Sequence, residues 1–179
     1  MNDVEIRDVL FRYLDEKHAK IRVFDELVIG RARADIVAVT DRVTGFEIKG
    51  DTDTYARLPG QIAEYDRYFE ENCIVVGASH RRSVERHIPE YWGIICVAEA
   101  DGGAAVEVVR EPQETIGFSW RKHLGLLWRS ELGRILKQNG QPKYYNKRKS
   151  FLVKSALTIP KDTLRAQVCE ELFERDYTL

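Results

Sequence analysis

Apolar residues recur at helical intervals at the start of the chain and alternate with polar residues soon after it. Between positions 4 and 14 the apolar side chains are spaced for one helix face, and the acidic Asp3 and Glu5 lie where a first helical turn favours negative charge. Residues 21–29 and 32–40 are two β-rich segments. The turn-forming sequence DRVTG then leads into FEIK, so we expect the second and third strands to form a hairpin.

The next segment predicts a second helix followed by more strands. An apolar stripe with helical spacing runs through residues 58–69. Pro59 favours the first turn of a helix, so this helix either begins beside the proline or is kinked there. Residues 73–79 are typical of a buried strand, and residues 92–100 and 104–111 of two more strands joined by a turn. This order of elements predicts a mixed α/β domain.

The pattern changes after the last predicted strand. Residues 118–138 carry the apolar stripe of an amphipathic helix, which Asn139 and Gly140 are expected to close. A basic segment follows, and a last helix is expected to start near Pro160. We therefore predict a mixed α/β domain over residues 1–112 and a helical C-terminal extension over residues 113–179.

Composition bounds the class of protein. The 179 residues are 44% hydrophobic and 32% charged, as in an ordinary globular protein, and the net charge of −1 gives no global signal for nucleic acid. No apolar run approaches the roughly 20 residues of a membrane span, and the charged N-terminus does not resemble a signal peptide. We expect a cytoplasmic protein without a membrane partner. Cys73, Cys96 and Cys169 lie far apart in apolar contexts and are expected to be buried thiols.

The sequence GFEIKGD places an acid and a base two positions apart in a predicted strand. Glu47 and Lys49 therefore point to the same face, and taken alone they are typical of a surface ion pair. Asp35 lies near the start of the preceding strand, at the edge of the sheet where the third strand ends. Two carboxylates close together suit Mg²⁺ (or Mn²⁺), and a lysine beside the metal can orient or deprotonate an attacking water. The arrangement predicts hydrolysis of a phosphodiester.

The spacing Asp35-x(11)-Glu47-x-Lys49, together with the order of elements, resembles the PD-(D/E)XK nuclease superfamily. The resemblance implies a restriction-endonuclease-like fold, which is a mixed sheet flanked by helices with an αβββαβ core. The proline of the signature is replaced by Ala34, which leaves the aspartate in place. Gln61 and Tyr65 match the Q-x-x-x-Y spacing of RecB-like nucleases, and the chain also looks like a group of small bacterial and phage proteins with this core.

The resemblance implies a metal-dependent nuclease that acts on DNA rather than RNA. Asp35 and Glu47 would bind the metal together with the Ile48 carbonyl, while Lys49 would assist the water. Gln61 would contact the site or the DNA, and Tyr65 would brace the site. A further acidic ligand often comes from the first helix or strand, where Glu5 and Glu26 are the candidates; either would otherwise be a simple surface carboxylate. Dimers are common in this superfamily, so a homodimer is one alternative.

Several charged residues near the predicted site allow a second interpretation. Asp51 and Asp53 would enlarge an acidic site, although helix capping explains them more simply. Arg31, Arg33 and Arg57 either meet phosphates or belong to an ordinary mixed-charge surface.

The two histidines after the predicted strand at residues 73–79 are a separate case. His80 and His87 lack the spacing of a zinc site or a catalytic dyad, so both are expected at the surface.

The basic segment of the C-terminal extension also has two interpretations. It contains five cations and no acid, with aromatic residues between them, which suits a nucleic-acid surface but also an ordinary solvated linker. The cations are Lys143, Lys147, Arg148, Lys149 and Lys154, and the aromatic residues are Tyr144, Tyr145 and Phe151. For the whole chain, the alternative to a nuclease is a non-catalytic nucleic-acid-binding or regulatory protein on the same fold.

Overall fold

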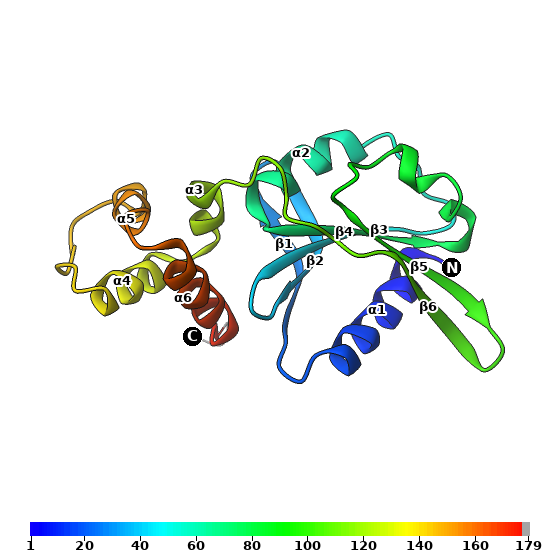
Figure 1. Ribbon diagram of the computed structural model, residues 1–179, viewed down its shortest axis with the longest axis horizontal. Helices are drawn as coiled ribbons and strands as arrows, with labels where there is room; N and C mark the ends of the chain where they lie inside the picture. The colour runs from blue at the N-terminus through cyan, green and yellow to red at the C-terminus, as the bar shows by residue number, and fades with distance from the viewer. Residues whose placement is uncertain (177–179) are drawn as a thin grey trace.

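A six-stranded mixed sheet forms the centre of the computed structural model, which describes residues 1–176 (Figure 1). The strands lie side by side in chain order; β3, β4 and β5 are parallel and the other neighbours are antiparallel. Their bounds are β1 Arg22–Ile29, β2 Ala32–Val39, β3 Val43–Lys49, β4 Glu71–Gly77, β5 Gly93–Ala100 and β6 Gly103–Arg110. With α1 (Asp3–Lys17) and α2 (Leu58–Tyr68), the predicted αβββαβ order and the mixed α/β fold class are confirmed.

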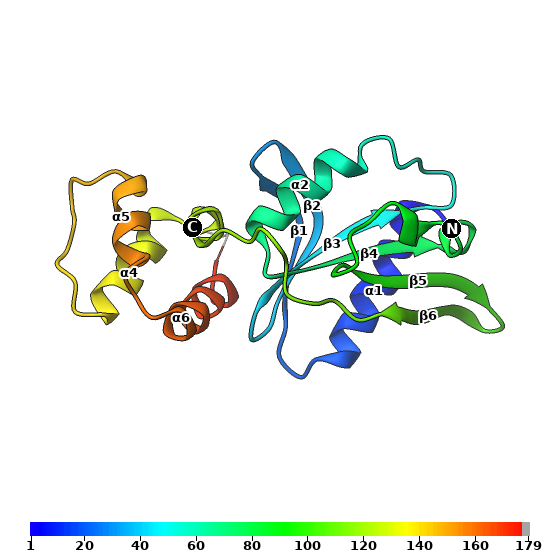
Figure 2. The ribbon, with the colours of Figure 1, turned by 45° about the horizontal axis from the view of Figure 1, so that its top comes forward.

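Helix α1 covers one face of the sheet (Figure 2). Asn2 and Glu5 begin it with a reciprocal capping box, in which each side chain accepts a hydrogen bond from the other residue's backbone N–H. The buried side chains of Ile6 and Leu10 pack against Phe46 and Ile48 of β3. The apolar half of the GFEIKGD strand therefore faces α1, and its charged half faces the opposite layer.

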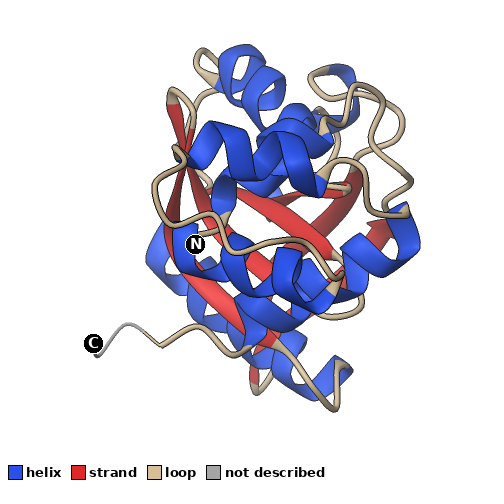
Figure 3. Ribbon diagram, turned by 90° about the vertical axis from the view of Figure 1, so that its left-hand side faces the viewer, coloured by secondary structure: helices blue, strands red, loops and turns tan. Residues whose placement is uncertain are grey.

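Helix α2 covers the other face, so that the sheet lies between helices (Figure 3). The helix begins at Leu58 with Pro59 in its first turn, which settles the question of a start or a kink. Gly45 lies beneath it in β3, where a Cβ atom would come within 2.8 Å of the Tyr65 ring. Gly45 thus serves close packing rather than the turn that DRVTG suggested, and β3 begins earlier than predicted, at Val43.

The C-terminal extension is helical, as expected, but it is divided differently. The single helix predicted over residues 118–138 is wrong, because the backbone is extended at Leu127 and Trp128. The Glu131 carboxylate accepts a hydrogen bond from the Trp128 N–H at 2.5 Å and so caps a new helix. The helices of the extension are α3 Trp120–His123, α4 Arg129–Gln138, α5 Lys149–Ala156 and α6 Lys161–Phe173, with the 3₁₀ turn η3 Leu124–Leu126 after α3. Two further 3₁₀ turns, η1 Ala78–His80 and η2 Val84–Arg86, lie between β4 and β5.

Other expectations for the extension are confirmed. Asn139 and Gly140, the latter with a φ of 71°, end α4, and α6 follows Pro160. Part of the basic segment, over which no helix was predicted, forms α5.

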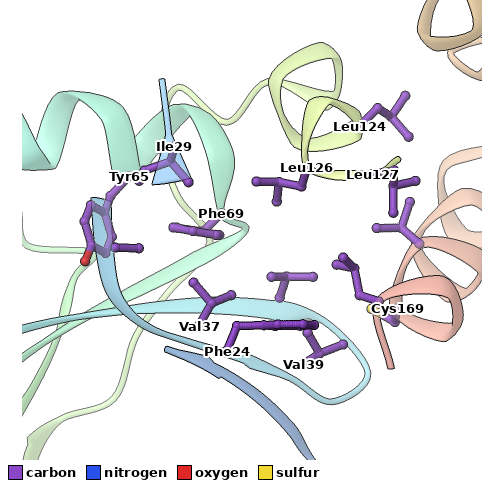
Figure 4. Close-up of a cluster of buried hydrophobic side chains, with 14 of the residues drawn as sticks. Phe24, Ile29, Val37, Val39, Tyr65, Phe69, Leu124, Leu126, Leu127 and Cys169 are labelled. Carbon is purple, nitrogen blue, oxygen red and sulfur yellow. The ribbon is translucent and has the colours of Figure 1, made fainter. Parts of the chain in front are cut away.

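One buried apolar cluster joins the sheet, α2 and the C-terminal helices (Figure 4). Phe24, Val39 and Phe69 belong to it, as do Leu126 and Cys169 from the extension. The domain boundary at residue 112 therefore stays a prediction.

The expectations for the thiols and for membrane spans can be compared with the structure directly. All three cysteines are buried and free, as expected. Within residues 1–176, no helix has the length and hydrophobicity needed to cross a bilayer.

Candidate active site

Strands β2 and β3 separate at the position of Asp35. Their hydrogen-bonded register ends with Ile36 opposite Phe46. Beyond that pair, the hydroxyl of Tyr65 bridges the two strands: it accepts a hydrogen bond from the Asp35 N–H at 3.0 Å and donates one to the Phe46 carbonyl at 3.2 Å. Tyr65 is fully buried, so it positions Asp35 rather than meeting a substrate.

Asp35 also leaves the register on its other side, toward β1. The β1–β2 ladder pairs Asp25 with Ile36 and Leu27 with Ala34, but it skips Glu26 and Asp35. Glu26 has a φ of 53°, an uncommon conformation for a residue other than glycine. The Asp35 carbonyl instead accepts a hydrogen bond from the Arg7 guanidinium at 3.1 Å. Both peptide groups of Asp35 are thus held by side chains from the two flanking helices.

The carboxyl group of Asp35 points toward the end of β3. Its Oδ2 accepts a hydrogen bond from the Ile48 N–H at 2.8 Å, and its Oδ1 lies 3.9 Å from the Arg7 guanidinium. Burial, followed by the negative charge of Glu47, raises the pKa of Asp35 to about 7, although the Ile48 hydrogen bond and the charge of Lys49 oppose the shift. Asp35 therefore changes its charge near neutral pH.

Glu47 and Lys49 form a buried pair on the same side of the sheet. Glu47 is 0% exposed and Lys49 is 4% exposed, and their Nζ and Oε1 atoms lie 2.5 Å apart. Lys49 Nζ also donates a hydrogen bond to Gln61 Oε1 at 3.3 Å. The interpretation as a surface ion pair is therefore wrong, and buried charges of this kind are expensive without further partners.

The second oxygen of Glu47, Oε2, is buried and has no hydrogen-bond partner among the described residues. The Tyr65 hydroxyl lies close to Glu47, but its one proton is donated to the Phe46 carbonyl. Burial, followed by the charges of Glu47 and Asp35, raises the pKa of Tyr65 well above its usual value, so this proton stays in place. Glu47 consequently has one carboxylate oxygen available for a ligand.

A cleft of about 890 Å³ opens over these residues. As many basic as acidic side chains line it. Arg31, Arg33 and Arg57 are among them, and Arg67 adds a further cation. Arg33 forms an ion pair with Glu26 at 3.2 Å. The arginines that flank the motif in sequence therefore also surround the site in space.

The two candidates for an additional acidic ligand both have other partners. Glu5 caps α1, and Glu26 lines the cleft but pairs with Arg33. Within the described part of the chain, no three His, Cys, Asp or Glu side chains gather closely enough to hold a metal. A cation in the cleft would be bound by Asp35 and Glu47, backbone oxygen such as the Ile48 carbonyl, and water, which suits Mg²⁺.

The prediction that Asp51 and Asp53 cap the second helix is also wrong, because α2 has no side-chain cap. Asp53 accepts a hydrogen bond from the Gly50 N–H at 2.8 Å, and Asp51 accepts one from the Ser79 N–H at 2.9 Å. The pKa of Asp51 is lowered to about 2, chiefly by its hydrogen bond to the N-terminal ammonium group. Asp51 thus holds the loop after β3 against η1, and Asp53 forms a hydrogen bond within that loop.

The prediction of surface exposure is confirmed for one of the two histidines. His87 is exposed as expected, whereas His80 is half-buried with its Nε2 3.0 Å from the Gly50 carbonyl.

Arg7 is the residue of the site that sequence reasoning missed. Its guanidinium forms ion pairs with Asp3 and Asp25 and donates a hydrogen bond to the Asp35 carbonyl. The only signal in the sequence was the i, i+4 spacing of Asp3 and Arg7, which is common on exposed helices.

The cations of the C-terminal extension do not line the cleft. Lys149 donates a hydrogen bond to the Gly125 carbonyl at 2.7 Å and so acts within the extension. The side chains of Lys143, Lys147 and Arg148 are exposed on the loop before α5. They belong to a separate surface.

Replacing Tyr65 by phenylalanine is expected to lower the free energy of unfolding by about 1–3 kcal/mol, because the Asp35 N–H and the Phe46 carbonyl lose their shared partner. Urea denaturation measures this effect. Tyr68→Phe, the same change at a half-buried position of α2, is the control and should cost less. Equal losses in the two variants would contradict the bridging role.

Comparison with known proteins places the chain in a family. The family model described as bacteriophage P4 protein cII matches residues 2–178. The chain belongs to this family. Protein cII of Enterobacteria phage P4 is 24% identical over 144 residues, which cover 78% of this chain and 54% of that protein. The chain thus spans about half the length of this cII relative, and the expected similarity to phage proteins is confirmed.

Among solved structures, the Pyrococcus furiosus SfsA structure in complex with Ca²⁺ aligns with a TM-score of 0.35 and 13% identity, over 60% of this chain and 61% of that one. A structural alignment with this TM-score gives no information about the site. Neither cII match names the PD-(D/E)XK superfamily.

Proposed function

We propose that the cleft binds Mg²⁺ or Mn²⁺ and hydrolyses phosphodiester bonds, with DNA as the substrate. Asp35 and Glu47 would supply carboxylate oxygens, and Lys49 would assist the attacking water. The observation that carries this proposal is the unpartnered Oε2 atom of the fully buried Glu47, beside a second carboxyl group with a raised pKa. A carboxylate oxygen buried without a donor is costly, and a cation relieves that cost.

The residues present fit a hard divalent cation. One oxygen of Glu47 contacts Lys49 and the other remains available, while Oδ1 of Asp35 has only a distant contact with Arg7. When bound, the cation would stabilise the negative charge that develops on the phosphate during hydrolysis. Mg²⁺ commonly uses only one or two protein carboxylates and several waters, so a third acidic side chain is not required.

Lys49 has the position that an assisting base or orienting group needs. Its ammonium lies between Glu47 Oε1 and Gln61 Oε1, so its direction is fixed by two acceptors. From there it can donate a hydrogen bond to a water or, when neutral, accept its proton. Gln61 acts through Lys49 and is therefore a positioning residue.

The wall of the cleft supports a phosphate-bearing substrate. Arg31, Arg33, Arg57 and Arg67 line it, and planar guanidinium groups pair well with phosphate oxygens. Because equal numbers of acids also line the cleft, the substrate would be drawn in chiefly by its contacts with these arginines rather than by a large net charge.

The second candidate function is regulation by binding without cleavage. Membership of the phage P4 cII family, shown over residues 2–178, supports it. In that case the arginine-lined cleft would hold nucleic acid, and the Glu47–Lys49 pair would be structural.

One experiment separates the two candidates. The purified chain is incubated with single-stranded, double-stranded and branched DNA in Mg²⁺ or Mn²⁺, with EDTA as the control. If the chain is a nuclease, DNA cleavage products should form only when the metal is present, and a Lys49→Ala variant should not form them. No cleavage of any of the DNA forms, together with tight salt-dependent binding, would favour regulation.

A further inference from the structure

We infer that the exposed basic and aromatic surface before and on α5 is a second site, which binds single-stranded nucleic acid. This binding surface consists of Lys143, Tyr145, Lys147, Arg148, Phe151 and Lys154. It lies in the helical extension, apart from the cleft, at the outer end of the molecule (Figures 1 and 2). The inference does not depend on cleavage, so it applies to both candidate functions.

Charge is segregated in this part of the chain. From Leu132 to Lys161 the sequence contains eight basic residues and no acidic residue, whereas the whole chain has a net charge of −1. Some of these cations have partners within the fold, such as Arg134, which pairs with Glu171. Those of the binding surface are exposed. A local positive surface on a nearly neutral protein favours an anionic partner.

Two exposed aromatic rings accompany these cations. Tyr145 is 69% exposed and Phe151 is 38% exposed. Lys143 Nζ lies 4.6 Å from the centre of the Tyr145 ring, and Lys147 Nζ lies 5.3 Å from that of Phe151. Each ring therefore has a cation over one of its faces, so a base stacked on the other face would place its phosphate near a lysine.

The fold holds this surface in place. Arg129, the first residue of α4, donates hydrogen bonds to three backbone carbonyls of the loop, at 2.7 Å to Tyr144, 2.6 Å to Tyr145 and 3.2 Å to Lys147. The Tyr144 and Phe151 rings pack in a T-shaped arrangement, with their centroids 5.0 Å apart. A loop fixed through its main chain presents its side chains at little entropic cost on binding.

The rings select single strands over other anionic partners. Bases in a duplex are stacked on one another, so their faces are not available to Tyr145 and Phe151. A duplex or an anionic lipid surface would use the cations alone. Binding that depends on both rings and cations therefore identifies a single strand.

Fluorescence anisotropy with a labelled oligothymidylate tests the inference on the full chain. EDTA is present throughout, so that cleavage cannot occur. Tyr145→Ala and Phe151→Ala are each expected to weaken binding about tenfold, which lies within the range for loss of one stacked base. The double variant Lys143→Ala/Lys147→Ala should also lower the salt dependence, by about 1.4 in the slope of log K against log salt.

Three controls make the result decisive. Arg82→Ala/Arg86→Ala removes two exposed cations outside the extension and should leave binding within twofold. A duplex of the same sequence and vesicles with anionic headgroups should bind less tightly than the oligothymidylate.

The inference is overturned if neither aromatic variant weakens binding, if the distant double variant weakens it equally, or if the duplex or vesicles bind as tightly. Thermal unfolding of each variant shows whether the fold is kept. Tyr145 and Phe151 are exposed, so their removal should leave it intact.

Discussion

Lys49→Ala is expected to lower the rate of DNA cleavage by about 10²–10⁴-fold, the usual contribution of a positioned proton-transfer group. The expectation follows from the place of Lys49 Nζ, held between Glu47 and Gln61 beneath the cleft. The measurement is the initial rate of product formation at saturating Mn²⁺, normalised to the fraction of folded protein. This normalisation matters because Glu47, which is fully buried, loses its charged partner in the variant.

Lys49→Arg is the matched control, since it keeps the positive charge but cannot act as a base near neutral pH. It should restore the stability lost in Lys49→Ala while restoring little of the rate. If Lys49→Ala cleaves as fast as the unmodified chain, Lys49 has no part in the chemistry. If only Lys49→Arg does so, Lys49 orients the water and does not accept its proton.

Asp35→Asn is expected to stabilise the fold at pH 8 by about 2–4 kcal/mol in the absence of divalent cations. The pKa of Asp35 is raised from 3.8 to about 7 in the folded state, first by burial and then by the charge of Glu47. Asparagine has no charge to desolvate, and its carbonyl oxygen can still accept the hydrogen bond from the Ile48 N–H. Asp35 thus destabilises the fold although Tyr65, Arg7 and the Ile48 N–H all hold it in place. Such a residue is typical of a functional site.

The sign of the pH dependence follows from the same shift. Between about pH 4 and pH 7 the folded state holds a proton on Asp35 that the unfolded state has released, so stability falls as the pH rises through this window. Urea denaturation should show this fall in the unmodified chain and a smaller one in Asp35→Asn. Mn²⁺ should recover stability at pH 8 in the unmodified chain alone. Parallel pH profiles for the two proteins would show that Asp35 is not shifted.

Strand periodicity in the sequence was enough to bring Asp35, Glu47 and Lys49 to one end of a hairpin. The pattern works because each residue lies on a strand whose face is fixed by apolar neighbours such as Phe46 and Ile48, buried against α1. The apolar stripe through residues 58–69 predicted the second helix, which carries Gln61, and the structure contains this helix. Local spacing decides these features.

The residues that hold Asp35 in place were not predictable, because they do so through contacts between elements far apart in the sequence. Arg7 reaches Asp35 only when α1 packs beside β2, and the Tyr65 hydroxyl enters a ladder that a regular hairpin would have closed. The break at Trp128 was missed for a different reason. The apolar stripe continues through it, and only the Glu131 cap reveals a new helix start.

Calorimetric titration with Mn²⁺ at pH 8 tests the central claim most directly, because it asks whether Asp35 and Glu47 share a cation. Glu26→Gln, which changes a cleft acid paired with Arg33, is the control. We expect the unmodified chain and the control to bind Mn²⁺, and Asp35→Ala and Glu47→Ala, each folded, not to bind it. Binding that survives both alanine substitutions unchanged would contradict the central claim.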